Sequence, residues 1–424
     1  MKKLKTILIG AGARGIRYTD IMGTMKDKYE VVAVAEPLEG RREYIKKMHN
    51  LPDNMCFDDW RSLLALGKIA DVAVIATMDQ EHFSPTVKAI ELHYDILLEK
   101  PISNSAYECA KIAELAEAEN VKVVICTVLR YTPFFGKLKE IIDSGAIGKV
   151  MSINHEECVG NVHQSHSFVR GNWGNAERSS SMLLQKSCHD MDILQWLVGS
   201  NPKKIQSFGT LSYFTSKNAP ENSPDYCIEG CPESESCPYN AVKLYLDDKN
   251  NRWFRNACTH TVNPSDELVR EAITHTQYGK CVFKCDNDVV DHQTVNILFE
   301  NDVTVTFTMN AFNKGGRFIH IMGTKGEIHA SLTENAPISV YDFETKKTST
   351  SYASGKEGIT NGHGGGDDGI VDAFYEYICG TYTGKAIPDI MQASDNHLIV
   401  FAAEKSRSEN TVVDFDEFKK SILM

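Results

Sequence analysis

A lysine motif near residue 100 could take part in proton transfer. Lys100 stands in Glu99-Lys100-Pro101, which closes the apolar run 94–101. We expect it to project beyond the carboxyl end of a strand, where open α/β sheets bind their ligands. An ammonium group in a partly desolvated cleft can hydrogen-bond a substrate hydroxyl and help to move its proton during hydride transfer. Taken alone, such a lysine is more often an ordinary surface residue.

A histidine motif runs from Gln185 to Trp196 and contains His189. We predict a helix over 189–198, which would place His189 in its first turn. A histidine there, aimed into a cleft, can shuttle a proton. The alternative is a capping or core histidine. On this helix one face carries His189, Asp192, Ile193 and Trp196.

A glycine-rich turn follows the first apolar run of the chain. Its sequence is Gly10-Ala11-Gly12-Ala13-Arg14-Gly15. Gly10 allows a tight turn, Gly12 lets the backbone approach a pyrophosphate, and Gly15 lets the next helix pack against the strand. The helix N-terminus offers N–H groups and a positive dipole end to phosphates. The turn therefore predicts a dinucleotide site.

An acidic residue indicates which dinucleotide this site prefers. Glu36 ends the second apolar run, 21 residues after Gly15, where a carboxylate would accept hydrogen bonds from the ribose hydroxyls. A carboxylate repels a 2′-phosphate, so the pattern favours NAD. Arg41 and Arg42 keep NADP as the alternative.

The composition is that of a globular protein, with 424 residues, 42% hydrophobic and 24% charged. This length favours two domains. A net charge of −12 without a Lys/Arg stripe argues against a nucleic-acid surface, and no apolar run approaches the roughly 20 residues of a membrane span. We interpret the apolar stretch behind the lysine-rich start as the first strand and not as an export signal. We therefore expect a cytoplasmic protein, whose 12 cysteines are thiols or metal ligands before disulfides.

The first third of the chain alternates apolar runs with helical periodicity, which predicts a parallel sheet. We expect this nucleotide-binding domain to span 1–127. Its later strands are predicted at 71–77, 94–101 and 121–126, and its later helices at 85–92 and 106–119.

The remainder, 128–424, is predicted to be an α/β substrate-binding and oligomerisation domain. Alternating apolar residues indicate a sheet with one covered face, which is usually antiparallel. A polar, cysteine-rich segment, about 212–291, is interpreted as an insertion. The predicted strands are 150–157, 294–299, 303–309 and 318–322, and the predicted helices are 134–143, 189–198, 370–377 and 391–408.

Five of the six cysteines of the insertion fall into two groups, one within 227–237 and one within 281–285. Four thiolates would suit a structural zinc ion, which would give this sheet-poor segment a folding centre. A [4Fe–4S] cluster is a second interpretation, and disulfides or free thiols are a third. The zinc ligands would be Cys227, Cys231, Cys237 and one of Cys281 or Cys285.

Taken together, these motifs resemble the Gfo/Idh/MocA oxidoreductases. The resemblance rests on the turn 10–15, Thr77 with His82, Glu99-Lys100-Pro101, and 189–192, in matching order and spacing. It implies a Rossmann domain followed by an α/β domain with an open, mostly antiparallel sheet. It also implies tightly held NAD(P), sugar or polyol substrates, and homodimers or homotetramers. The cofactor residues would be Gly10, Gly12, Ala13, Arg14, Gly15, Glu36, Thr77, His82, Glu99 and Lys100.

By position, the resemblance makes Lys100 the lysine beside the substrate hydroxyl and His189 the general acid/base. Dehydrogenases of this family usually have an aspartate four residues before that histidine, but here the position is Gln185. Glutamine can hold a hydroxyl but cannot take its proton, so the proton relay must differ. Lys186 would add a second cation to the cleft or lie in solvent, and Asp192 shares the face of His189.

The run Gly362-His363-Gly364-Gly365-Gly366-Asp367 looks like a loop of glycosidase-type members of the family. Those enzymes oxidise a sugar hydroxyl transiently, eliminate the aglycone, add water and reduce the product again. His363 could then serve as an acid/base. A flexible surface loop is the alternative.

Two further runs, 129–135 and 165–173, resemble members linked with the bacterial breakdown of plant polysaccharides. Sugar contacts would come from Tyr131, His166, Arg170 and Trp173. We therefore expect an NAD-dependent oxidoreductase acting on a sugar, sugar acid or polyol. The alternatives are a glycoside hydrolase or lyase with recycled NAD, and a non-catalytic NAD-bound sensor.

Overall fold

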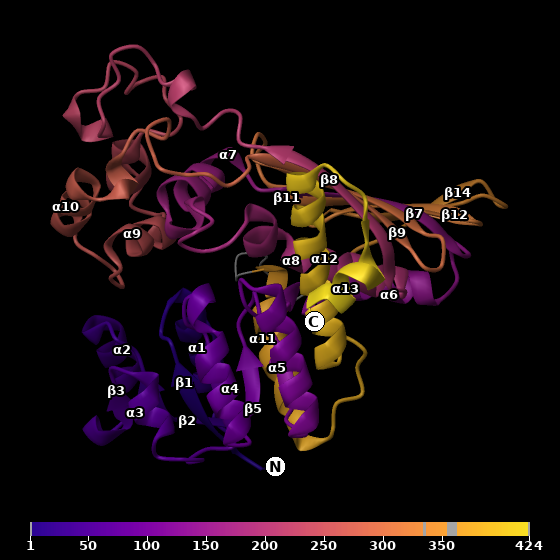
Figure 1. Ribbon diagram of the computed structural model, residues 1–424, viewed down its shortest axis with the longest axis horizontal. Coiled ribbons are helices and arrows are strands. Elements are labelled where there is room, and N and C mark those ends of the chain that lie inside the picture. Colours follow the sequence, from indigo (N-terminus) through magenta and orange to yellow (C-terminus); the bar gives the residue numbers. More distant parts are fainter. Residues whose placement is uncertain (1, 334–335, 354–362, 423–424) are drawn as a thin grey trace.

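The computed structural model describes residues 2–333, 336–353 and 363–422, which build two sheets with flanking helices (Figure 1). The first sheet has six parallel strands in the order β3-β2-β1-β4-β5-β6. Its central strands are apolar and fully buried, as a sheet covered on both faces requires. The strands are β1 (Leu4–Ile9), β2 (Tyr29–Ala35), β3 (Cys56–Phe57), β4 (Val72–Ile75), β5 (Asp95–Leu98) and β6 (Val123–Ile125).

Helices connect these strands, so the predicted Rossmann fold is confirmed. The helices are α1 (Ala13–Thr24), α2 (Glu39–His49), α3 (Trp60–Leu64), α4 (Phe83–Glu91) and α5 (Ala106–Ala118). The carboxyl ends of β1, β4 and β5 lie next to one another, because these strands are neighbours in the sheet. The glycine-rich turn, Thr77 and Lys100 therefore meet at one edge.

The second sheet has nine strands in the order β14-β13-β12-β11-β7-β10-β9-β8-β15. Only the β7–β10 pair is parallel, so the prediction of an open, mostly antiparallel sheet is confirmed. The strands are β7 (Val150–Cys158), β8 (Pro202–Thr210), β9 (His292–Phe299), β10 (Thr304–Asn310), β11 (Gly316–Gly323), β12 (Gly326–Ser331), β13 (Ile338–Asp342), β14 (Lys347–Ser351) and β15 (Val413–Asp414).

One face of this sheet packs against helices. Burial alternates residue by residue along β9, which matches its alternating sequence. The shared apolar core includes side chains of α6 (Pro133–Asp143), α8 (Met182–Val198) and α12 (Ile390–Glu409). None of the helices in the described part of the chain is long and apolar enough to cross a membrane.

Helix α8 begins seven residues earlier than the sequence predicts. Ser181 caps it by accepting a hydrogen bond from the Leu184 N–H, and Gly199 ends it in a left-handed conformation with φ +67°. His189 consequently lies in the interior of the helix, and its predicted place in the first turn was wrong. The polar pair Gln185-Lys186 obscured the apolar pattern of this first turn.

The insertion lies between β8 and β9 and contributes no strand to either sheet. It contains α9 (Arg252–Thr259), α10 (Asp266–His275) and several single turns. These helices enclose a small apolar core of their own around Tyr245, Phe254 and Ile273. Figure 1 places the insertion over the α1 and α2 side of the nucleotide-binding domain.

The C-terminal helices are shared between the two domains. Ile370, Val371 and Phe374 of α11 (Gly366–Cys379) complete the apolar core beside β1 and β2. The Tyr29 hydroxyl donates a hydrogen bond to the Val371 carbonyl at 2.7 Å. Helix α12 packs between α5 and α8, and α13 (Phe415–Ile422) follows it.

Candidate functional site

Lys100 joins the two domains at the carboxyl edge of the parallel sheet. Its Nζ donates hydrogen bonds to the main-chain carbonyl of Gln185 at 2.9 Å and to its side-chain Oε1 at 3.2 Å. His189 lies one turn further along α8, on the face that carries Gln185. The structure therefore brings the predicted lysine to the helix face that carries the predicted histidine, which is 4% exposed.

Asp79 completes this group and was missed by sequence reasoning. Its carboxylate accepts hydrogen bonds from the Gln185 amide and from the Ser179 hydroxyl, the latter at 2.7 Å. This pairing turns the Gln185 amide oxygen towards Lys100. A signal was present, because Asp79 follows Thr77 beyond the carboxyl end of β4, where ligand-facing residues gather.

Glu99, the residue before Lys100, holds this part of the site in place. It accepts hydrogen bonds from Arg14 Nε at 2.7 Å and from the Tyr18 hydroxyl at 2.8 Å. Burial alone would raise the pKa of Glu99, but the charges of Arg14 and Lys100 hold it below its usual value. Arg14 also forms a bidentate ion pair with the buried Asp367, at 2.7 and 3.1 Å. Arg14 and Glu99 thus fix the nucleotide turn and the first turn of α11 to the end of β5, just before Lys100.

The glycine turn has the geometry that a dinucleotide needs. A Cβ on Gly10 would lie 2.5 Å from the Ala76 carbonyl oxygen, and one on Gly15 would lie 2.1 Å from the Gly10 carbonyl oxygen. Above Gly12, by contrast, the nearest atom is Arg41 Nη1 at 4.0 Å. The two outer glycines permit close packing, and the central one leaves room at the N-terminus of α1. These residues fit a pyrophosphate.

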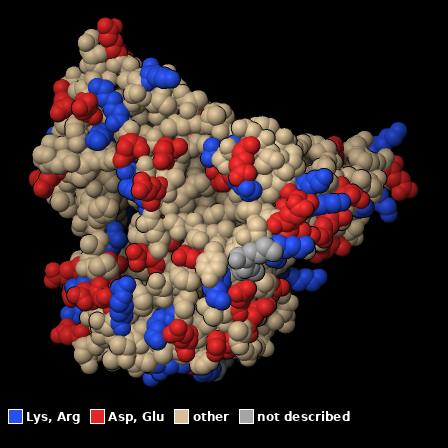
Figure 2. All heavy atoms as spheres, in the orientation of Figure 1, with Lys and Arg blue, Asp and Glu red and all other residues tan. Residues whose placement is uncertain are grey.

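The insertion approaches the same turn from the other side. Figure 2 shows the surface hollowed between the insertion and the nucleotide-binding domain. Burial lowers the pKa of His260, at the end of α9, and the nearby charge of Arg41 lowers it further. Arg41 therefore lies between Gly12 and the insertion.

Glu36 and His82 hold neighbouring loops in place. Glu36 is buried at the end of β2, and its two carboxylate oxygens accept hydrogen bonds from the N–H groups of Ala11 and Leu38 at 2.6 and 3.0 Å. His82 contacts the Pro101 carbonyl through Nδ1 at 2.7 Å and the Thr77 carbonyl through Nε2 at 3.3 Å. His82 therefore links the loops that follow β4 and β5.

Lys186 and Asp192 have partners inside the second domain. Lys186 forms an ion pair with the buried Glu157 at 3.1 Å. Asp192 accepts a hydrogen bond from Arg130 Nε at 2.7 Å, and burial raises its pKa although the charge of Arg130 opposes this. Tyr131 follows Arg130, and its buried hydroxyl has no hydrogen-bond partner among the described residues.

Three predicted sugar contacts lie on the segment that meets the insertion. His166 Nδ1 forms a hydrogen bond with the Tyr245 hydroxyl at 2.8 Å. The His166 ring stacks on the Phe254 ring, with 3.8 Å between the ring centroids. Burial lowers the pKa of His166 to about 3. Arg170 donates to carbonyls of the insertion, and Trp173 stacks on Phe168. The structure therefore brings His166 and Arg170 to the insertion and not to the Lys100 group.

The predicted zinc centre is not preformed. All 12 cysteines are free thiols, and Cys227, Cys231, Cys237 and Cys281 line one cavity. Cys285 lies beside it and donates to the Cys281 carbonyl at 3.4 Å. Over the described ranges, no three of these thiols lie within 4.8 Å of one another, the spacing expected around a single ion.

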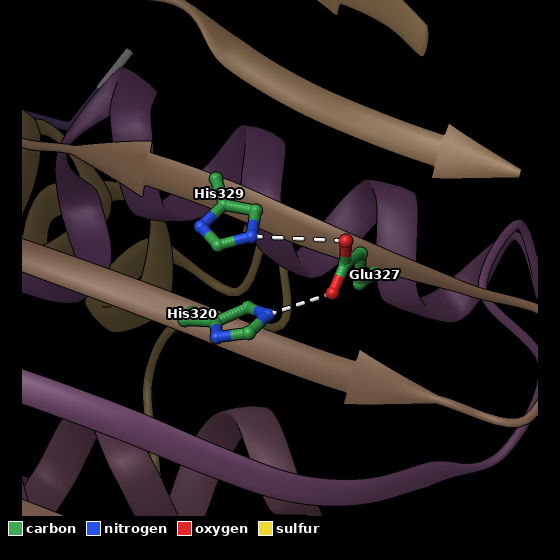
Figure 3. Close-up of side chains that lie close together, drawn as sticks. All are labelled: His320, Glu327 and His329. Atoms are coloured by element: carbon green, nitrogen blue, oxygen red, sulfur yellow. Dashed lines mark hydrogen bonds and ion pairs between the residues drawn. The ribbon is translucent and has the colours of Figure 1, made fainter. Parts of the chain in front are cut away.

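A different group of side chains has its possible metal-ligand atoms within 4.8 Å of one another, and the sequence did not predict it. His320 of β11 lies opposite His329 of β12, their rings stack with centroids 3.8 Å apart, and Glu327 lies beside the pair (Figure 3). Glu327 contacts His320 Nε2 at 3.0 Å and His329 Nε2 at 3.8 Å. One hydrogen bond and the ring stacking account for its arrangement, and it lies on a different sheet from Lys100. Such cross-strand pairs emerge only once the strand register is known.

The His363 motif is described only in part. The backbone of His363–Gly365 forms a turn before α11, whereas the His363 side chain lies outside the described residues. Asp367 already belongs to α11. The second half of the predicted loop is therefore helical.

The two domains match the models of one family of enzymes. Residues 4–127 match its NAD-binding Rossmann fold, and residues 139–415 match its C-terminal alpha/beta domain. The chain therefore belongs to the Gfo/Idh/MocA oxidoreductase family, as the sequence motifs predicted.

Among its relatives is the Bacillus subtilis protein YteT, named as an oxidoreductase, with 25% identity over 326 residues, 72% of each chain. Over 211 residues, 49% of this chain and 53% of that protein, it is 25% identical to the 2,7-anhydro-N-acetylneuraminate hydratase of Mediterraneibacter gnavus. The scyllo-inositol dehydrogenase of Lactobacillus casei, solved with NAD(H) and scyllo-inositol, has a TM-score of 0.66 at 14% identity, over 98% of this chain and 100% of that one. The similarity to the Lactobacillus casei enzyme is a similarity of fold.

Proposed function

We propose that the protein is an NAD-dependent oxidoreductase that transfers hydride from a carbinol carbon of a sugar, sugar acid or polyol. One observation carries the proposal. Lys100, beside the dinucleotide turn, contacts Gln185 one helical turn from His189. Family relatives that are named for acting on inositol and other carbohydrates support this substrate class.

In this mechanism the bound nicotinamide supplies the hydride acceptor. Lys100 donates a hydrogen bond to the substrate hydroxyl and stabilises negative charge that develops on its oxygen. His189 takes the hydroxyl proton. Gln185 cannot accept a proton, so it orients the lysine while Asp79 fixes its amide. Glu36 favours NAD over NADP because a buried carboxylate at the end of β2 repels a 2′-phosphate.

The proposal is tested with purified protein and a panel of sugars, sugar acids and polyols. NADH absorbance should rise with one class of substrate and fail to rise in Lys100→Ala and His189→Ala, both of which should retain NAD. If every substrate leaves the wild-type absorbance unchanged while NAD is bound, the dehydrogenase is excluded, and the sensor is favoured only if aryl glycosides are not cleaved either.

A glycoside hydrolase or lyase with recycled NAD is the second candidate. In its favour, the Arg14–Asp367 ion pair holds the first turn of α11, four residues after His363, beside the dinucleotide turn. A relative named as a hydratase shows that the family includes members not named for net oxidation. Aryl glycosides distinguish the candidates, because aglycone release at constant NADH absorbance supports only the second.

We further propose that the protein is a cytoplasmic homodimer or homotetramer. Phe208 and Phe318 are 56% and 38% exposed on the sheet face that α8 and α12 leave uncovered. A second copy of the chain would bury them. Light scattering tests this, and a monomer at all concentrations would contradict it.

A further inference from the structure

The cysteine-bearing segments of the insertion meet around one cavity. Cys281 follows Cys227 by 54 residues, but the segments pair through a bridge between Tyr226 and Lys280 and a 2.8 Å hydrogen bond from the Cys281 N–H to the Asp225 carbonyl. Four of these thiols, Cys227, Cys231, Cys237 and Cys281, line this cavity. The backbone thus brings together thiols that lie far apart in the sequence.

A buried cation also faces this cavity. Arg170, only 1% exposed, donates from Nε to the Lys280 carbonyl at 2.8 Å and from Nη2 to the Tyr239 carbonyl at 2.7 Å. Nη2 also lies 3.6 Å from Cys227 Sγ. Its Nη1 is buried with no hydrogen-bond partner among the described residues. A buried guanidinium with an unused donor indicates that the cavity receives an anionic group.

The spacing of the thiols favours a centre larger than a single ion. Four thiolates around one zinc ion, with bonds of about 2.3 Å, would lie roughly 3.8 Å apart. No three thiols in the described ranges approach within 4.8 Å of one another. In a cluster each thiolate binds a different iron atom, so the sulfur atoms lie further apart around a larger centre.

We propose that this cavity binds a [4Fe–4S] cluster through Cys227, Cys231, Cys237 and Cys281. Binding of a preassembled cluster, with two ferrous and two ferric ions, releases one proton from each thiol and changes no oxidation state. The cluster with its four thiolates carries about two negative charges, and Arg170 offsets one of them. The cluster adjoins the small apolar core of Phe214, Val282 and Phe283 where the two cysteine-bearing segments meet, and its role is structural.

This proposal is independent of the dehydrogenase assignment. The cluster would fix the segment 227–237 to the segment around Cys281, in the same insertion that faces Arg41 above the dinucleotide turn. Its presence is measured without any substrate, so failure of either proposal leaves the other intact.

The test is a metal and sulfide analysis of the full chain purified without oxygen. We expect about four iron atoms and four acid-labile sulfides per chain, with broad visible absorption that oxygen bleaches. Cys231→Ser should lose most of the iron. Cys258→Ser is the matched control and should retain it, because Cys258 lies in the other core of the insertion and bonds the Arg255 carbonyl.

Three outcomes would overturn the proposal. They are one zinc ion per chain without sulfide, no iron even after reconstitution with iron and sulfide, or equal iron content in the two variants. If Cys231→Ser does not fold, as judged by lost NAD binding, the iron and sulfide content of the wild-type chain decides alone.

Discussion

Lys100 donates to two oxygens of the same residue, the main-chain carbonyl of Gln185 at 2.9 Å and its amide oxygen at 3.2 Å. Both acceptors are neutral, so this contact orients the ammonium without cancelling its charge. The carboxylate of Asp79 bonds the Gln185 amide, so Gln185 stands between this carboxylate and the lysine. The predictions below follow from this arrangement and from the groups around it.

Lys100→Ala should lower kcat by about 10²- to 10⁴-fold, because the substrate oxygen loses its hydrogen-bond donor. The dissociation constant for NAD should change only a few-fold. Stopped-flow NADH absorbance and NADH fluorescence titration measure the two quantities. Lys88→Ala is the control, since Lys88 is an exposed lysine paired with Glu91. An unchanged kcat in Lys100→Ala would remove this lysine from the mechanism.

Asp79→Asn should reduce kcat/KM by roughly tenfold, because the Gln185 amide loses the carboxylate that orients it. Ser179→Ala removes only a neutral hydrogen bond to the same carboxylate and should have a smaller effect. Steady-state kinetics of both variants shows which of them loses more kcat/KM. Equal effects, or a larger effect of Ser179→Ala, would contradict the positioning role of Asp79.

Glu36→Gln should raise the affinity for NADP relative to NAD by about tenfold or more, because the charge that repels a 2′-phosphate is removed. Titration calorimetry with both dinucleotides gives the ratio. Glu39→Gln, on the neighbouring exposed turn, serves as the comparison. An unchanged ratio would show that Glu36 does not face the ribose.

Arg41→Ala should weaken the binding of both dinucleotides and speed their release, because Arg41 Nη1 lies 4.0 Å from the Cβ position above Gly12. Chase experiments with fluorescent NADH measure the release rate. Arg61→Ala removes a surface arginine paired with Asp59 and should leave that rate unchanged. An identical rate in Arg41→Ala would place the pyrophosphate elsewhere.

His166 should make the protein sensitive to acid. Its pKa is about 3 in the folded chain and about 6.5 when unfolded, so its stabilising contribution is complete above pH 6.5 and is lost as the pH falls towards 3. The loss is roughly 1.4 kcal/mol per pH unit within that window. The free energy of unfolding, measured with urea between pH 6.5 and 5, should fall less steeply with decreasing pH in His166→Gln than in the wild type. His275→Gln, an exposed histidine on α10, should keep the wild-type slope.

Local pattern was enough to predict the parallel sheet and its dinucleotide turn. The apolar runs of β4 and β5 and the spacing of Gly10, Gly12 and Gly15 encode these features within a few residues each. The covered face of the second sheet could be predicted for the same reason, because apolar and polar residues alternate along the sequence of β9.

The partners of the site residues could not be predicted in this way. Asp79 and Gln185 are 106 residues apart, and Arg14 and Asp367 are 353 apart, so their pairing depends on how the domains dock. The contact of Arg170 with the insertion was likewise hidden, because the carbonyls that hold it belong to loops without any periodic pattern.

The packing of α11 against β1 and β2 bears on how the chain folds during its synthesis. Strands β1 and β2 leave the ribosome first, but the side chains of Ile370, Val371 and Phe374 that cover them are made more than 300 residues later. Domains generally fold as they emerge, so the second domain can form its sheet while the first still exposes part of its core. The domain that begins the chain is therefore the last to be finished, and a nascent chain cannot complete its dinucleotide cradle until α11 has emerged.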